Sequence, residues 1–294
     1  MGMGHIVKSY DNELENLKKL LIEMMETNLD QLNLLYDLIN YKANMLDINS
    51  NFSAEICNKV SDIDVKINSF DIKIIEESLK IFSLRNPVAY DLRFVFSASH
   101  VSSNLERLGD NAKAIARHMK KAEENRGNVE RHMSKEEFGE YLSSMRDLHT
   151  SNRFPRRSFS FGRNARRNMK NFEPNLEENN EQDLMQARTI LGVIINKYLE
   201  ILHILVEMLH LTIDAFNYMS VDIYKKVQGM DTKVDALTNE VSHLLLREIH
   251  LIPERTADIR LNFLVNRALE RMGDHIVAAC RYVNFIEENT MIYN

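Results

Sequence analysis

Two paired carboxylates recur in the chain at the same spacing. One pair lies in Glu106-Arg107-Leu108-Gly109-Asp110 and the other in Glu270-Arg271-Met272-Gly273-Asp274. A Glu and an Asp four residues apart lie one turn above each other on one face of a helix, with Cβ atoms roughly 5–6 Å apart. Such a pair binds a hard metal ion when a neighbouring helix adds further oxygen ligands. The repeated pentapeptide indicates an internal duplication and predicts a metal site in each half.

Further oxygen ligands are expected from a second repeated motif. Asp64-Val-Lys-Ile-Asn68 and Asp231-Thr-Lys-Val-Asp235 are 167 residues apart, whereas the pentapeptides are 164 apart, so a three-residue deletion relates the two halves. The candidate metal ligands are Glu106, Asp110, Glu270, Asp274, Asp64, Asn68, Asp231 and Asp235. Oxygen ligands favour hard ions such as iron, manganese or magnesium, and zinc is a further candidate. Because Asn68 replaces a carboxylate, we expect the second half to bind metal more tightly.

The glycine inside each pentapeptide costs roughly 1 kcal/mol of helix stability relative to alanine. Its recurrence at the same position predicts a close approach by another backbone, a ligand or a partner. The acids of both pentapeptides lie off the apolar seam of their helices, whose residues recur at steps of four and three. We therefore expect the metal sites on the surface of the helical bundle.

The same apolar periodicity predicts long helices throughout the chain, and strand-like alternation is hard to find. Helices are expected over residues 8–46, 53–85, 87–125, 182–219 and 221–250, with a sixth after Pro253. Long helices joined by short turns pack antiparallel. The fold is therefore predicted to be all-α, a tandem repeat of two antiparallel three-helix bundles. The expected domains are 1–125 and 182–294, separated by a basic insertion at 126–181.

The insertion differs from the rest of the chain in composition. The net charge of the chain is −6, but Arg146–Lys170 holds eight basic residues and one acid, so the remainder carries about −13. The basic residues alternate with Phe154, Phe159 and Phe161, a pattern that suits RNA or anionic lipid. A disordered spacer has a similar composition. We expect a reversible electrostatic tether to an anionic membrane surface, and no specific nucleic acid.

Catalytic motifs are not found. The pairs Glu207/His210 and Glu240/His243 have the spacing of a diiron carboxylate enzyme, but both lie off the seam in one half, which favours surface salt bridges. A helical carboxylate-bridged metalloenzyme remains one alternative, and a protein that binds an anionic membrane or nucleic acid through the basic insertion is the other. Cys57 and Cys280 are expected to be reduced, buried thiols. Without an apolar run near 18 residues or a signal peptide, the protein is expected to be cytoplasmic, with a peripheral position at the inner membrane.

Together these motifs resemble the PhoU family of phosphate-signalling regulators. The resemblance begins at His5-Ile-x-x-Ser-Tyr-Asp-x-Glu-Leu14 and includes Asn86-Pro-x-Ala-x-Asp91-Leu-Arg93, besides the two repeated motifs. It covers nearly all of the chain except the insertion. The doubled Glu-Arg-x-Gly-Asp at this spacing is its most specific sign.

The resemblance implies a tandem three-helix fold, a homodimer, and metal clusters held on the surface by the eight residues named above. It also implies a non-enzymatic regulator that restrains phosphate uptake and the phosphate-starvation response. Its expected partners are the ATPase subunit of the phosphate ABC transporter and a phosphate-sensing histidine kinase. The long insertion and Asn68 depart from the family pattern.

Overall fold

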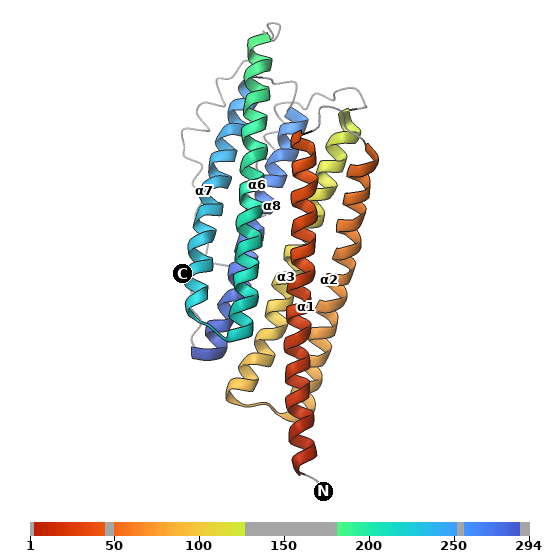
Figure 1. Ribbon diagram of the computed structural model, residues 1–294, viewed down its shortest axis with the longest axis vertical. Coiled ribbons are helices and arrows are strands. Elements are labelled where there is room, and N and C mark those ends of the chain that lie inside the picture. Colours follow the sequence, from red (N-terminus) through yellow and green to blue (C-terminus); the bar gives the residue numbers. More distant parts are fainter. Residues whose placement is uncertain (1–2, 45–49, 127–180, 252–255, 289–294) are drawn as a thin grey trace, which may run out of the picture.

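The computed structural model describes residues 3–44, 50–126, 181–251 and 256–288, and every regular element in these ranges is a helix. The helices are α1 (Met3–Asn44), α2 (Ser50–Arg85), α3 (Ala89–Arg126), α6 (Glu181–Tyr218), α7 (Asp222–Leu251) and α8 (Thr256–Glu288). They run side by side along the long axis of the molecule (Figure 1). The predicted all-α fold is confirmed. The basic stretch Arg146–Lys170 lies outside the described residues.

The predicted helix ends are right to within one or two residues, with three exceptions. Helix α1 begins at Met3 rather than at residue 8. The other two exceptions are the start of α2 and the position of Pro87. The second helix ends at Arg85 as expected, and Asn86 follows with a φ of 47°. Pro87, however, does not lie in the first turn of the third helix, which begins at Ala89 with a φ of 49°. The chain thus passes through two left-handed residues around Pro87. The helix expected from residue 53 begins three residues earlier, at Ser50, so Ser53 lies inside the helix, where it is buried.

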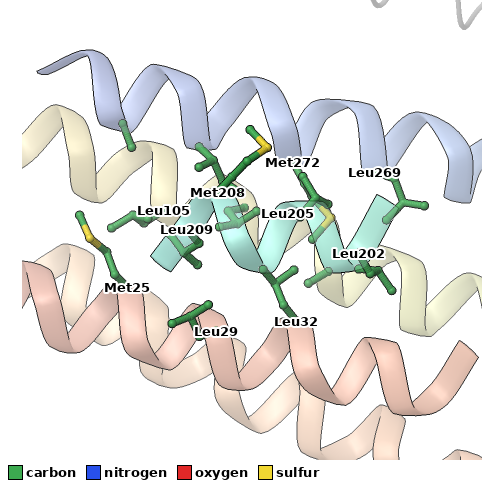
Figure 2. Close-up of a cluster of buried hydrophobic side chains, with 14 of the residues drawn as sticks. Met25, Leu29, Leu32, Leu105, Leu202, Leu205, Met208, Leu209, Leu269 and Met272 are labelled. Carbon is green, nitrogen blue, oxygen red and sulfur yellow. The ribbon is translucent and has the colours of Figure 1, made fainter. Parts of the chain in front are cut away.

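The two halves share one hydrophobic core rather than each burying its own. Two helix pairs join the halves, α3 with α8 and α1 with α6. Among the described helices, α2 contacts only α1 and α3, and α7 contacts only α6 and α8. Figure 2 shows side chains from both halves meeting at the centre: Met25, Leu29 and Leu32 of α1, Leu105 of α3, Leu202, Leu205, Met208 and Leu209 of α6, and Leu269 and Met272 of α8. Each half therefore depends on the other for part of its apolar burial.

Helices α3 and α8 join the halves in an antiparallel contact. Residue numbers fall along α8 as they rise along α3: Phe96 contacts Phe285, His100 stacks on Tyr282, and Asn104 lies 3.4 Å from His275 Nδ1. Continuing this register places the two pentapeptides opposite each other at the middle of the contact. The duplicated motif is therefore central to the molecule.

Within each half, the pentapeptide glycine faces the neighbouring helix. A Cβ built on Gly109 would lie 3.0 Å from Ile67 Cδ1 of α2, and one built on Gly273 would lie 2.5 Å from Asp231 Oδ1 of α7. The predicted close approach is real. However, the atoms that make it are side chains of the same half rather than a backbone, a ligand or a partner.

Among the helices of the described ranges, none combines the length and the apolar character needed to cross a membrane. Cys57 and Cys280 are both buried and neither is in a disulfide, as predicted for reduced interior thiols.

Replacement of Gly273 by alanine is expected to lower the free energy of unfolding by about 1–2 kcal/mol. Overpacking against buried Asp231 costs about 1–3 kcal/mol, and the gain in helix propensity returns up to about 1 kcal/mol. Gly109→Ala should be closer to neutral, since the end of the Ile67 side chain can shift. Urea unfolding at pH 7 measures both effects.

Gly192→Ala and Gly229→Ala are the matched controls, because both glycines are helical and nothing lies within 4 Å of a Cβ built there. They should raise stability by up to about 1 kcal/mol. Equal effects at Gly273 and Gly229 would contradict the packing explanation.

Candidate metal centre

The eight candidate ligands lie at graded depths between the surface and the core. Asp110 and Asp274 are exposed, as the sequence predicted, but Glu106 and Glu270 are half-buried. Asp64 and Asp231 are buried, with Asn68 and Asp235 at intermediate exposure. The expected surface position therefore holds only for the outer acid of each pentapeptide. Each group extends inward along the contact between the pentapeptide helix and the outer helix of its half.

In the first half, carboxylates crowd around Glu106. Its pKa is raised above the ordinary value by burial and by the nearby charges of Asp110 and Asp71, while Arg107 lowers it. Asp71 was not among the predicted residues. It accepts a 2.6 Å hydrogen bond from Ser102 Oγ. Since it follows Asp64 by seven residues, or two helical turns, the heptad spacing could have revealed it.

Asp64, the innermost acid of this group, is bound by a lysine. Lys113 Nζ donates a 2.6 Å hydrogen bond to Asp64 Oδ2. This bond raises the pKa of Lys113, which remains charged. Lys113 lies seven residues after Glu106 and three after Asp110, so it lies along the same side of α3. The sequence analysis missed this residue as well.

In the second half, the same crowding is stronger. Burial and the charge of Asp274 raise the pKa of Glu270 from its ordinary value to about 7, and Asp235 contributes in the same direction. Arg267 and Arg271 oppose the shift only in part. The structure thus brings three of the predicted acids of this half close enough to interact through their charges.

The donor chemistry fits a metal, but the side chains do not converge on one. In the described part of the chain, no three His, Cys, Asp or Glu side chains are grouped closely enough to hold a metal ion. At the same time, Asp64 Oδ1 and Asn68 Oδ1 are buried without a hydrogen-bond partner, a state that costs free energy. Oxygen donors are therefore present in each half, but coordination requires their side chains to move.

The pentapeptide arginines lie between the two acidic groups. Burial, followed by the charges of Arg107 and Arg271, lowers the pKa of His275 to about 4, so this histidine is neutral at pH 7. Arg107 belongs to α3 and Arg271 to α8, so both arginines come near the same ring at the contact between the halves. Each arginine also lies near the glutamate of its own pentapeptide, so the contact between the halves combines positive and negative charge.

The two Glu/His pairs whose spacing is that of a diiron enzyme lie on the surface. Glu207, His210, Glu240 and His243 are all exposed. Glu240 accepts a hydrogen bond from Lys197 Nζ. This agrees with the prediction of surface salt-bridge residues and gives the metalloenzyme alternative no support.

The raised pKa of Glu270 predicts that the metal-free protein loses stability as the pH rises from about 4.5 to about 7. Across this window the native state binds more protons than the unfolded state, so the free energy of unfolding falls with increasing pH. Glu270→Gln removes this titration. The melting temperature of the wild type, measured after chelation, should therefore drop relative to that of Glu270→Gln between pH 5 and 7. A constant difference between them would show that Glu270 titrates normally.

Comparison with known proteins finds the PhoU domain family at residues 21–119 and 198–283. A relative in Zymomonas mobilis, described as a phosphate-specific transport system accessory protein PhoU homolog, is 34% identical over 117 residues. That alignment covers 40% of this chain and 45% of the relative, so it spans less than half of either protein.

Two solved structures have the same fold. The crystal structure of PhoU from Pseudomonas aeruginosa matches with a TM-score of 0.64 and 21% identity, covering 96% of this chain and 100% of that one. PhoU from Streptococcus pneumoniae, a phosphate transport system regulatory protein, matches with a TM-score of 0.61 and 16% identity over 96% and 99% of the two chains. Because the family match covers both halves and includes both pentapeptides, the chain belongs to the PhoU domain family.

Proposed function

We propose that this protein is a non-enzymatic accessory regulator of a phosphate transport system. The observation that carries this proposal is the PhoU domain match over both halves, supported by the description of the Zymomonas relative. In this role the protein restrains phosphate uptake and the phosphate-starvation response. It does so in the cytoplasm, as a homodimer, by contacting the ATPase subunit of the phosphate ABC transporter and a phosphate-sensing histidine kinase.

The surface that best suits such a contact lies on the outer side of α2. Val65, Ile72 and Leu79 are 66%, 57% and 62% exposed, and each follows the last by seven residues, so the three share one face. Ile67, Ile74 and Ile81, two residues further along, are completely buried in the protein's own core. Helix α2 is thus apolar on two faces, and only one of them is covered.

The other half indicates that two of these three positions need not be apolar for the fold. With the 167-residue offset, Val65 and Ile72 correspond to Thr232 and Asn239 of α7, whereas Leu79 corresponds to Leu246. The bundle therefore forms with polar residues at the first two positions. A row of exposed aliphatic side chains is typical of a protein contact surface. We assign the row of Val65, Ile72 and Leu79 to contact with the ATPase subunit.

Deletion of the gene should raise phosphate uptake and starvation-gene expression under phosphate-replete conditions, and the intact gene should restore both. Complementation with Val65→Lys/Ile72→Lys/Leu79→Lys should fail, because three lysines replace the apolar contact surface. Phosphate uptake and a starvation-gene reporter measure the response. Circular dichroism of the purified variant should retain the helical signal.

The matched control is Thr232→Lys/Asn239→Lys, which changes the corresponding face of α7 and should complement fully. A deletion strain with normal uptake and normal starvation-gene expression would disprove the regulatory role. Full complementation by the triple variant would disprove only the assigned surface.

We also propose that the acidic groups bind a hard metal ion such as iron or manganese. Glu270, Asp274 and Asp235 supply oxygen donors in the second half, with Asp231 behind them. Positive charge there would offset the burial and the repulsion by Asp274 that together raise the pKa of Glu270. In a non-enzymatic regulator, a metal at this position would have a structural or regulatory role.

The metal content of two double variants compares the halves. Glu270→Ala/Asp274→Ala should lose most of the metal that the wild type binds, whereas Glu106→Ala/Asp110→Ala should lose less. Elemental analysis of protein purified from its own host gives the stoichiometry and names the metal. An equal or greater loss of metal from Glu106→Ala/Asp110→Ala would contradict the prediction that the second half binds metal more tightly.

A further inference from the structure

The exposed row of α2 is part of a longer stripe whose positions follow one another at alternating steps of three and four. These six positions, the outer seam, are Val65, Asn68, Ile72, Ile75, Leu79 and Phe82. Ile75 is exposed, and Asn68 and Phe82 are half-buried. Steps of three and four are typical of a helix that packs lengthwise against another helix. Helix α2 therefore has a second such seam beside the one that contacts α1 and α3.

A helix is the element that matches the outer seam. Phe82 follows Val65 by 17 residues, so the seam is about 25 Å long. The backbone of α2 is hydrogen-bonded within its own helix, so an extended segment lying on it would find no partner for its N–H and C=O groups. A second helix satisfies its backbone internally and presents side chains at the same spacing.

Helix α3 borders the outer seam on one side. Ser102 Oγ donates a 2.6 Å hydrogen bond to Asp71 of α2, and the charge of Asp71 also acts on Glu106, one turn further along α3. Leu92 and Ser99 precede Glu106 by fourteen and seven residues, so they lie on the same side of α3. This border therefore changes from apolar at Leu92, through serine, to acidic at Glu106.

The acidic end of the border selects the charge of the occupant. Asp110 is exposed one turn beyond Glu106, and Asp71 lies beside them. A Lys or Arg of a helix on the seam would make charge-assisted hydrogen bonds to these acids, whereas an acidic residue would be repelled. At the other end, Leu79 and Leu92 are exposed and favour apolar side chains. The charge thus fixes which end of the occupant lies over the acids.

The second half differs at the corresponding positions. With the 167-residue offset, four of the six seam positions are polar in α7: Thr232, Asp235, Asn239 and Ser242. With the 164-residue offset, Ser99 and Ser103 of α3 correspond to the larger Phe263 and Arg267 of α8. Small side chains let two helices approach closely. The first half is therefore the one whose outer surface suits a further helix.

We propose that the outer seam of α2 binds an amphipathic helix of the ATPase subunit, with apolar side chains along α2 and a basic residue over Asp71, Glu106 and Asp110. The inference rests on the proposed contact with the ATPase subunit and names the kind of element that makes it. In the complex this helix packs against α2 and α3, so the first half becomes a four-helix bundle.

Photo-crosslinking of the full-length chain to the purified ATPase subunit of its own host tests the helix. p-Benzoylphenylalanine replaces Val65 in one variant and Leu79 in another, at exposed positions 14 residues apart, a distance of about 21 Å. Mass spectrometry locates the crosslinked residues. A helix along the seam should give crosslinks about 14 residues apart in one segment of the ATPase subunit.

An extended segment covers the same distance with about six residues. Crosslinks about six residues apart, or in unconnected segments, would disprove the helix and leave the contact surface intact. Crosslinks to another part of this chain, or to a second copy of it, would disprove the proposed occupant.

The charge of the occupant is tested with Asp110→Lys. Its affinity for the ATPase subunit, measured by calorimetry after chelation so that no metal neutralises the acids, should fall about tenfold or more, since an attraction becomes a repulsion. Replacing the basic residue of the crosslinked segment by glutamate should restore binding to Asp110→Lys. The charge-matched control is Asp37→Lys, at an exposed position of α1, which should bind as the wild type does.

Equal affinities of Asp110→Lys and Asp37→Lys would show that the acids do not contact the occupant and would overturn its assigned charge. Circular dichroism confirms that both variants are folded. If the wild type does not bind the ATPase subunit at all, both this inference and the assigned surface fail. The regulatory role is then decided separately, by the phosphate uptake of the deletion strain.

Discussion

The structure depends on the antiparallel contact between α3 and α8. This contact joins the halves, and it places the pentapeptides opposite each other at the centre of the molecule. The same two helices also pack against α2 and α7 through Gly109 and Gly273. A side chain at Gly273 would collide with Asp231, so the glycine determines how closely the acidic faces of α8 and α7 approach. One pair of helices therefore controls both the assembly of the halves and the geometry of the acidic groups.

The close approach has an electrostatic consequence. It brings carboxylates from two helices together at the edge of an apolar core, where their repulsion is screened less than in water. In the first half Lys113 binds Asp64, and burial together with the charges of Asp110 and Asp71 raises the pKa of Glu106. In the second half burial and the charge of Asp274 raise the pKa of Glu270 to about 7. Carboxyl groups with raised pKa values are common at functional sites.

The duplication also separates structural from functional surface. Core positions such as Ile67 and its counterpart Val234 are buried in both halves, because both bundles must fill a similar space. The exposed positions are free to differ. The outer face of α2 carries Val65 and Ile72 where α7 carries Thr232 and Asn239. Comparing the halves therefore identifies a surface that packing within the monomer does not explain.

The sequence by itself determined the helices, the duplication and most of the acidic residues, because periodicity and spacing depend only on the geometry of a single helix. It did not predict every residue that meets them from a neighbouring helix. Asp71 and Lys113 complete the first acidic group only because α2 and α3 pack in one particular register. The shared core was missed for the same reason, since an apolar stripe does not specify its partner helix. Tertiary packing alone decided which acids are buried, which are paired, and where the two halves meet.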